Sequence, residues 1–360
     1  MNIAIIDADL IGRAKHRFPN LALMKISGYY KANGHNTKLL TEYSDLHTYD
    51  KVFISKVFTD TPIDESILLM PNVEYGGTGF YYDKAPRLPY EIEHHFPDYN
   101  LYLDYVNDEL DRGAKRKEYE YYLDYSIGFT TRGCFRKCSF CVNKNYSKVD
   151  KHSPLSEFYD PNKKYICLLD DNILGYAKWQ DVFDELIATN KPFQYKQGMD
   201  ERILTPKKCE YLAKAKYKKR FIFAFDNIED APIITDKIRL LREYTNKECM
   251  FYVLCGYDRK DSWDYDFWVQ DIVDTFERLK ILMEYKCLPY IMRYERYVDS
   301  PYRGIYVTLA RWCNQPSFFQ KKSFREFCIL NGENSSSMRY LKEFEKAHPT
   351  IAKEYFDLKS

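Results

Sequence analysis

Six short apolar segments recur through the second part of this 360-residue chain, at intervals of 28 to 39 residues. Each has the composition of a buried strand, and each interval leaves room for one helix. The helical spacing is clearest between residues 177 and 190, where one face carries Trp179, Val182, Phe183, Leu186 and Ile187. The segments are residues 126–131, 165–169, 193–197, 221–225, 250–254 and 289–293. Six successive βα units predict an α/β protein whose parallel sheet rolls into a partial TIM barrel.

The start of the chain predicts a further α/β domain. Residues 2–7 have the β-branched run of a buried strand, and residues 20–33 carry a helical apolar stripe that ends at Gly34. Residues 37–40 and 51–55 then supply two more strand candidates. Strand, helix and strand in this order are typical of a Rossmann-like domain.

We therefore expect four parts along the chain. They are a Rossmann-like domain at residues 1–75, a connector at 76–125, a (βα)6 partial barrel at 126–298 and a C-terminal cap at 299–360. The connector lacks periodicity and is rich in glycine, proline and tyrosine, so we expect it to wrap one domain onto the next.

The charge balance and hydropathy of the chain limit the kinds of partner that it can bind and the cellular compartment that we expect for it. Lys plus Arg number 54 and Asp plus Glu number 53, so no whole-chain field exists to hold nucleic acid or an anionic membrane. No stretch approaches the length and apolarity of a membrane span, and Asp7 and Asp9 interrupt the apolar start before it could serve as a signal peptide. We expect a cytoplasmic protein with no membrane partner. A local contact with nucleic acid stays open.

Three of the ten cysteines are clustered after the first predicted barrel strand. In the segment TTRGCFRKCSFCVNK, Cys134, Cys138 and Cys141 have the spacing C-x3-C-x2-C. Three thiolates can hold three irons of a cubane and leave the fourth iron open, as a catalytic metal site requires. The alternative is a structural zinc loop, for which His152 is the nearest fourth ligand.

This motif, with the aromatic Phe140 directly before the third cysteine, resembles the signature of the radical S-adenosylmethionine (SAM) superfamily. Its location after the first strand of a six-unit partial barrel resembles that superfamily as well. Residues 1 to about 60 resemble the cobalamin-binding-like domain that precedes the barrel in one subgroup, and several segments look like those of an uncharacterised subgroup of that kind. The resemblance implies a [4Fe-4S] cluster that reductively cleaves SAM to a 5′-deoxyadenosyl radical, which abstracts hydrogen from a substrate.

The resemblance also implies site residues. It makes Cys134, Cys138 and Cys141 the cluster ligands and places Phe140 against the adenine of SAM. Asp170, Asp171 and Asn172 stand where the family often has Gly-Gly-Glu for the SAM amino group; the two glycines are absent, and a helix N-cap is the alternative for these three. The remaining predicted cofactor-binding residues, at the ends of later strands, are Gln197, Asp226, Asn227 and Gly256.

Cobalamin binding through a histidine ligand is not expected. The motif D-x-H-x-x-G is absent, and the nearest approach, Asp45 to Asp50 around His47, ends in aspartate and precedes a strand. Cobalamin binding without such a histidine stays open. No cysteine precedes Cys134, which disfavours a methylthiotransferase, since that class needs an auxiliary cluster.

The sequence thus predicts a radical SAM enzyme whose substrate and net reaction are unidentified. A small-molecule substrate is preferred, with nucleic-acid or peptide modification as alternatives. A non-catalytic iron-sulfur or zinc-binding protein is the alternative from another class. A reducing partner such as flavodoxin or ferredoxin is expected to supply the electron.

Overall fold

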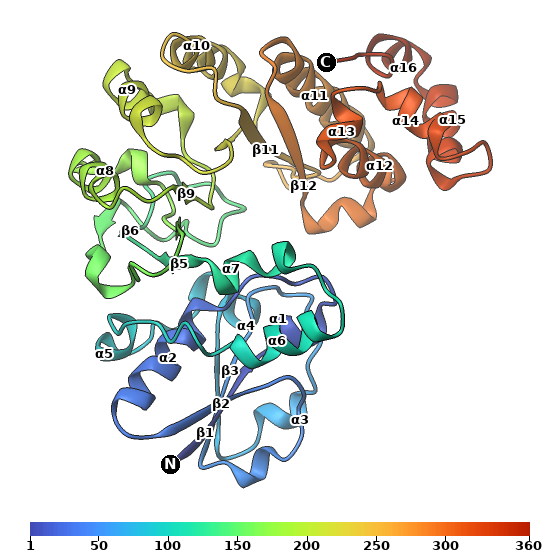
Figure 1. The fold of residues 1–360 in the computed structure, drawn as a ribbon. Helices are drawn as coiled ribbons and strands as arrows, with labels where there is room; N and C mark the ends of the chain where they lie inside the picture. The colour runs from blue at the N-terminus through green and yellow to red at the C-terminus, as the bar shows by residue number, and fades with distance from the viewer. The chain divides into compact units, whose positions relative to one another are not determined.

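The computed structural model describes residues 1–360 and divides into two compact units. The first unit contains Met1–Asp171 and Tyr176–Phe193, and the second contains Asn172–Gly175 and Gln194–Ser360. Figure 1 shows the elements of each unit along the chain.

Four strands form the first sheet, in the order β2-β1-β3-β4, and all neighbours are parallel. Residues Ile3 to Ile6 of the central strand β1 are fully buried because side chains pack on both faces of the sheet. The strands are β1 (Asn2–Asp7), β2 (Asn36–Leu40), β3 (Lys51–Ser55) and β4 (Val73–Gly76). The first three confirm the predicted strands. The fourth was missed, because its sequence VEYG is short and carries an acidic residue and a glycine.

The helix α2 (Leu21–Ala32) confirms the predicted helical stripe and shows how local chemistry sets its ends. The side chain of Asn20 accepts a hydrogen bond from the amide of Leu23 at 3.3 Å and caps the first turn. Gly34 follows the helix with φ of +77°, a conformation that glycine adopts without steric cost.

The connector is more regular than predicted. Its longest helix, α6 (Leu103–Asp111), buries Val106 in the same core as Ile3 and Leu23. Leu103, Val106 and Leu110 have helical spacing, a signal that the surrounding tyrosines and prolines concealed. The other short elements of the connector are α4 (Thr78–Tyr81), η2 (Tyr82–Lys84), α5 (Tyr90–Glu93), η3 (Arg116–Tyr119) and α7 (Glu120–Leu123). Three short elements precede it, α1 (Ala8–Gly12), η1 (Leu46–Thr48) and α3 (Glu65–Leu68).

All six predicted barrel segments contain a strand. They form two three-stranded sheets, β5-β8-β9 and β10-β11-β12, so their closure into one partial barrel stays a prediction. The strands are β5 (Tyr125–Gly128), β8 (Tyr165–Leu168), β9 (Phe193–Tyr195), β10 (Phe221–Ala224), β11 (Cys249–Cys255) and β12 (Leu288–Arg293). The first ends earlier than predicted, because residues 131–132 belong to a separate strand, β6 (Thr131–Arg132), which pairs with β7 (Asp150–Lys151).

Helices follow these strands, as the spacing predicts. They are η4 (Leu155–Glu157), η5 (Ile173–Gly175), α8 (Trp179–Ala188), η6 (Glu201–Ile203), α9 (Pro206–Lys214), η7 (Ile228–Asp230), α10 (Ala231–Arg242), α11 (Tyr265–Glu284) and η8 (Glu295–Asp299). The helical cap contains α12 (Arg303–Cys313), α13 (Pro316–Phe319), α14 (Phe324–Leu330), α15 (Ser336–Ala347) and α16 (Pro349–Tyr355). None of the helices combines the length and apolarity needed to cross a lipid bilayer.

The division between the two units falls within the predicted barrel and not at residue 126. The reason is packing: Tyr125, Ile127 and Cys167 form a buried cluster with Phe18 of the amino-terminal segment and Tyr121 of the connector. The strands β5 and β8 therefore belong to the same unit as the first sheet.

Candidate functional site

The cysteine triplet lies on a loop that leaves β6 at Gly133 and returns to β7. We call residues 133–148 the cysteine loop. Thr131 pairs with Lys151 and Arg132 with Asp150 in antiparallel fashion, which closes the base of the loop. Gly133 has φ of +96°, and a side chain there would collide with the carbonyl oxygen of Lys148. The chain therefore needs glycine directly before the first cysteine.

Exposure separates the triplet from the other cysteines. Cys134, Cys138 and Cys141 are partly exposed, whereas the remaining seven cysteines are buried. Buried thiols usually act as small apolar side chains, so the triplet supplies the accessible thiols of this chain.

Two backbone amides point at sulfurs of the triplet. The amide of Arg136 donates to Cys134 Sγ at 3.3 Å, and the amide of Asn143 donates to Cys141 Sγ at 3.4 Å. Burial raises the pKa of the Cys141 thiol, the amide of Asn143 opposes this, and the charges of Cys138 and Cys134 raise it further. The sulfurs are thus close enough to influence one another electrostatically.

The donor set fits an iron-sulfur cubane by its chemistry. No three His, Cys, Asp or Glu side chains of the chain converge on one point in the manner of a site for a single metal ion. A cubane makes a different demand, because each cysteine binds a separate iron corner. Three partly exposed thiols on one loop meet that demand.

Asp171 joins residues on either side of the cysteine triplet. Its Oδ2 accepts a hydrogen bond from the amide of Gly133 at 2.6 Å, and its Oδ1 accepts one from Asn143 Nδ2 at 2.7 Å. These partners stand one residue before Cys134 and two residues after Cys141. One carboxylate therefore bridges the whole triplet.

Asp170 also braces the chain through its carboxylate, and it is more deeply buried than Asp171. It is 2% exposed, and its carboxylate accepts hydrogen bonds from the amides and hydroxyls of Thr130 and Thr131, at 2.5 to 3.0 Å. Burial raises the pKa of Asp170, while these donors oppose the rise. Asp170 and Asp171 thus bind the protein's own strand ends and loop, and not the turn η5 that follows them. Sequence reasoning weighed a SAM contact or a helix cap for them and missed this bracing role.

Phe140 is half-buried, and its backbone joins the cysteine loop to the connector. Tyr82 Oη donates to the carbonyl oxygen of Phe140 at 2.8 Å. Nearby, Asn145 Nδ2 donates to the carbonyl oxygen of Asp83 at 3.2 Å, and Lys144 pairs with the carboxylate of Asp83 at 3.2 Å. The connector thus supports the cysteine loop, a role that its composition did not reveal.

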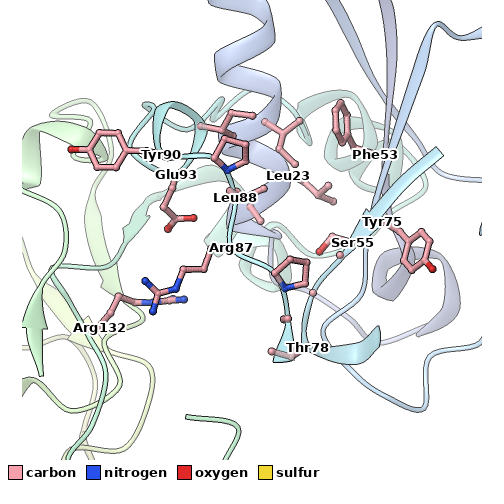
Figure 2. A pocket seen from close by; sticks show the side chains of 18 of the residues that line it. Leu23, Phe53, Ser55, Tyr75, Thr78, Arg87, Leu88, Tyr90, Glu93 and Arg132 are labelled. Atoms are coloured by element: carbon pink, nitrogen blue, oxygen red, sulfur yellow. The ribbon is translucent and has the colours of Figure 1, made fainter. Parts of the chain in front are cut away.

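A cavity of about 1130 Å³ lies in the first unit, beside the cysteine loop (Figure 2). The loop contributes Val142, Asn143, Asn145 and Tyr146 to its wall. The apolar part of the wall comes from α2, β3 and the connector, and it includes Leu23, Ile26, Phe53, Leu88 and Ile92. The polar part includes Arg87, Glu93, His94, Arg132 and His152.

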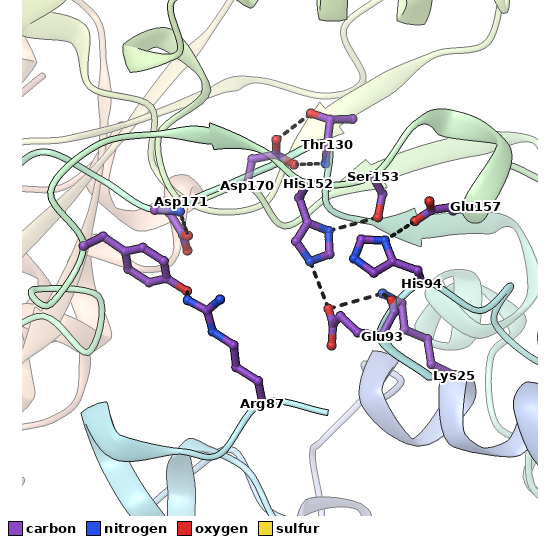
Figure 3. Close-up of polar contacts among 12 residues, drawn as sticks. Lys25, Arg87, Glu93, His94, Thr130, His152, Ser153, Glu157, Asp170 and Asp171 are labelled. Atoms are coloured by element: carbon purple, nitrogen blue, oxygen red, sulfur yellow. Dashed lines mark hydrogen bonds and ion pairs between the residues drawn. The ribbon is translucent and has the colours of Figure 1, made fainter. Parts of the chain in front are cut away.

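A paired network of charges lines one side of this cavity (Figure 3). Glu93 Oε1 lies 3.1 Å from His152 Nε2 and 3.4 Å from Lys25 Nζ. Burial would raise the pKa of Glu93, but His152, Lys25 and Arg132 outweigh it and lower the pKa to about 2. His94 Nδ1 lies 2.8 Å from a carboxylate oxygen of Glu157, and its ring stacks on that of His152. No sequence motif predicts this network, because its residues are far apart in the chain.

The other predicted cofactor residues lie in the second unit. Asp226 follows β10 and accepts a hydrogen bond from the amide of Leu254 at 3.1 Å, and burial raises its pKa. Asp226 and Asn227 line a small cavity of about 180 Å³. Gly256 follows β11 with φ of +73°, and its amide donates to Asp271 Oδ2 at 2.7 Å.

Two predicted residues differ in their exposure. Asn172 is buried at 3% exposure, whereas Gln197 is exposed after β9. Contact of these second-unit residues with a cofactor stays a prediction.

No protein-family model matches this chain, and no curated protein sequence matches it. Among solved structures, Streptococcus suis SuiB is 12% identical with a TM-score of 0.32, over 59% of this chain and 57% of that one. SuiB bound to its precursor peptide SuiA is 12% identical with a TM-score of 0.33, over 60% and 59%. The apo form of the cobalamin-dependent SAM radical enzyme OxsB is 11% identical with a TM-score of 0.38, over 98% and 56%. The chain thus spans less than two thirds of each neighbour, and similarity at this level establishes no function.

Proposed function

We propose that this protein is a radical SAM enzyme. The observation that carries the proposal is the placement of the C-x3-C-x2-C triplet. Its three thiols are the accessible ones among ten cysteines. They lie on a loop that Asp171 braces on both sides of the triplet and that contributes part of the wall of a large cavity. Ligands for a redox cluster beside a substrate-sized space are what such a reaction needs.

Each part of the site then has a role. Cys134, Cys138 and Cys141 hold a [4Fe-4S] cluster, and the amides of Arg136 and Asn143 support two of the thiolates. When bound, the cluster supplies the electron that cleaves SAM to methionine and a 5′-deoxyadenosyl radical, which abstracts hydrogen from the substrate. Asp170 and Asp171 fix the loop. In this proposal the electron comes from a reducing partner such as a flavodoxin or ferredoxin.

The SAM-binding residues are proposed by their position at strand ends. Phe140 lies on the cysteine loop and offers an aromatic face for adenine. Asp226 and Asn227 follow β10 and offer acceptors for ribose hydroxyls. The backbone at Gly256 is a further proposed contact for adenine, at a position where Tyr297 packs against this glycine. Gln197, Asn172, Asp170 and Asp171 remain in the proposed set, and Asp170 and Asp171 in addition brace the strand ends and the cysteine loop. Cobalamin is not part of the proposal.

The substrate is proposed to be a small molecule. The cavity of about 1130 Å³ is slightly larger than the roughly 300 to 1,000 Å³ typical of small-molecule sites, and its wall combines apolar side chains with many polar and charged ones. Modification of a nucleic acid or a peptide by the same chemistry is the alternative.

The test is anaerobic reconstitution followed by measurement of iron, sulfide, methionine and 5′-deoxyadenosine. We expect one [4Fe-4S] cluster per chain and SAM cleavage under reducing conditions. Cys134→Ala, Cys138→Ala and Cys141→Ala should each abolish cleavage, whereas Cys209→Ala should leave it, since Cys209 is fully buried on α9. Cleavage that survives in any triplet variant would contradict the assignment. Stoichiometric zinc in place of iron, with no SAM cleavage, would identify a structural metal site.

A further inference from the structure

We propose that the large cavity of the first unit binds its ligand through a carboxylate or phosphate group held by Arg87 and Arg132. This inference rests on the proposed function for its meaning as substrate recognition, although the binding itself can be measured without SAM. It adds a chemical class to the unidentified substrate: an anionic, partly apolar small molecule.

The two arginines approach the cavity from different segments. Arg132 ends β6, two residues before Cys134, and its guanidinium lies 4.0 Å from the centre of the Phe129 ring. Arg87 lies on the connector, where it donates to Tyr146 Oη at 3.4 Å. Both residues line the cavity, and Figure 2 shows their side chains pointing toward one another. Neither guanidinium has a carboxylate within 4.0 Å, the limit for an ion pair.

The acidic residues of the cavity wall are neutralised by other cations. Glu93 pairs with Lys25 and His152, as described above. The remaining pairs join Glu74 to Lys51 at 2.8 Å, Asp83 to Lys144 at 3.2 Å and Asp150 to Lys148 at 2.9 Å. Arg132 is close enough to Glu93 to lower the pKa of that carboxyl, but neither Arg132 nor Arg87 forms a direct ion pair with a carboxylate of the wall, and an anion can supply such a partner.

The chemistry of the ligand follows from the two walls. A guanidinium presents a planar fork of donors that matches carboxylate and phosphate oxygens in pairs. The apolar part of the lining includes Leu23, Phe53 and Ile92, so it suits the hydrocarbon part of a molecule. An acidic head at Arg132 would be anchored at the foot of the cysteine loop, where it would hold the rest of the ligand beside that loop.

The test uses the full-length protein and three probes that share one alkyl chain: octanoate, octyl phosphate and octanol. Calorimetric titration should give at least tenfold tighter binding for an anionic probe than for octanol. Arg87→Gln and Arg132→Gln should each weaken anion binding at least tenfold and leave octanol binding unchanged. A stronger effect on octanoate or on octyl phosphate identifies the head group.

Arg112→Gln is the matched control, since this arginine lies outside the cavity and its side chain is 73% exposed. Equal binding of octanol and the anions, or equal losses in Arg112→Gln, would overturn the proposal. If Arg132→Gln fails to fold, anion binding is measured with Arg87→Gln and Arg132→Lys instead. SAM cleavage is assayed separately. Cleavage without anion preference refutes this inference alone, and anion binding without cleavage refutes only the proposed function.

Discussion

Replacing Asp171 distinguishes a brace of the cysteine loop from a ligand of SAM. The motif comparison assigns this carboxylate to the SAM amino group, whereas the structure gives both of its oxygens to the loop, through Gly133 and Asn143. A brace affects cluster retention, and a SAM ligand affects SAM affinity at a full cluster. The variant Asp171→Ala separates the two roles.

The magnitude follows from the two hydrogen bonds. A hydrogen bond to a charged group contributes about 1.5 to 3 kcal/mol, and Asp171 makes two, at 2.6 and 2.7 Å. Because Asp171 is partly exposed, the lower end of that range applies, which gives about 3 kcal/mol for the pair. If the bound conformation of the cysteine loop loses about 3 kcal/mol of stabilisation, its affinity for the cluster falls roughly a hundredfold.

Asp171→Asn should have a smaller effect than Asp171→Ala. The side-chain oxygen of an asparagine can still accept a hydrogen bond from the backbone amide of Gly133. The side-chain amide of Asn143 can rotate so that its oxygen accepts a hydrogen bond from the side-chain nitrogen of that asparagine. Two neutral hydrogen bonds would then replace two charge-assisted ones, which are roughly twice as strong.

The assay is the rate of iron loss from reconstituted protein exposed to a ferrous chelator, together with hydrogen exchange across residues 133–143. We expect fast iron loss and fast exchange in Asp171→Ala, intermediate values in Asp171→Asn, and wild-type values in Asp181→Ala. Asp181 is an exposed residue of α8 and serves as the control. If Asp171→Ala keeps its cluster at the wild-type rate and loses only SAM affinity, the bracing argument is wrong and the motif assignment is right.

Two further predictions concern other carboxylates at strand ends. Asp226→Ala should keep the cluster spectrum and weaken SAM binding at least about tenfold, since a charged acceptor for ribose is lost; unchanged affinity would remove Asp226 from the cofactor site. Burial raises the pKa of Asp7 from 3.8 to about 7, so the folded chain holds a proton that the unfolded chain releases, and stability falls as pH rises from about 4 to about 7. Asp7→Asn should remove that slope and raise stability at pH 8 by about 1 to 3 kcal/mol, which urea unfolding at pH 5 and pH 8 measures; an unchanged slope would refute this.

Most strands of this fold were predictable because buried strands have short, continuous apolar sequences. The segment IAII of β1 and the segment FIFA of β10 are apolar because neighbouring strands and helices enclose them. The element β4 was missed because its residues Glu74 and Tyr75 are exposed, so nothing in its composition records the pairing with β3. The helix α6 was missed for the opposite reason, since its stripe was present and the irregular sequence around it dominated the interpretation.

The cysteine loop was predictable from spacing, but the cavity beside it was not. A C-x3-C-x2-C pattern is local, so the printed sequence shows it directly. The cavity depends on Arg87, Glu93 and Arg132, which are brought to one wall by the connector and β6. Their proximity is a property of the tertiary structure, and no periodicity of the chain encodes it.

The aspartates at strand ends show why polar residues there are ambiguous in sequence. A SAM ammonium and a backbone amide are both hydrogen-bond donors, so a carboxylate suits either of them equally well. Asp170 and Asp171 accept from the chain itself, and so does Asp226, through the amide of Leu254. Asp226 differs because it also lines a cavity, and it therefore has space in front of it for an external donor. Position at a strand end thus identifies the residues that can bind a cofactor, and adjacent space selects those that remain available to do so.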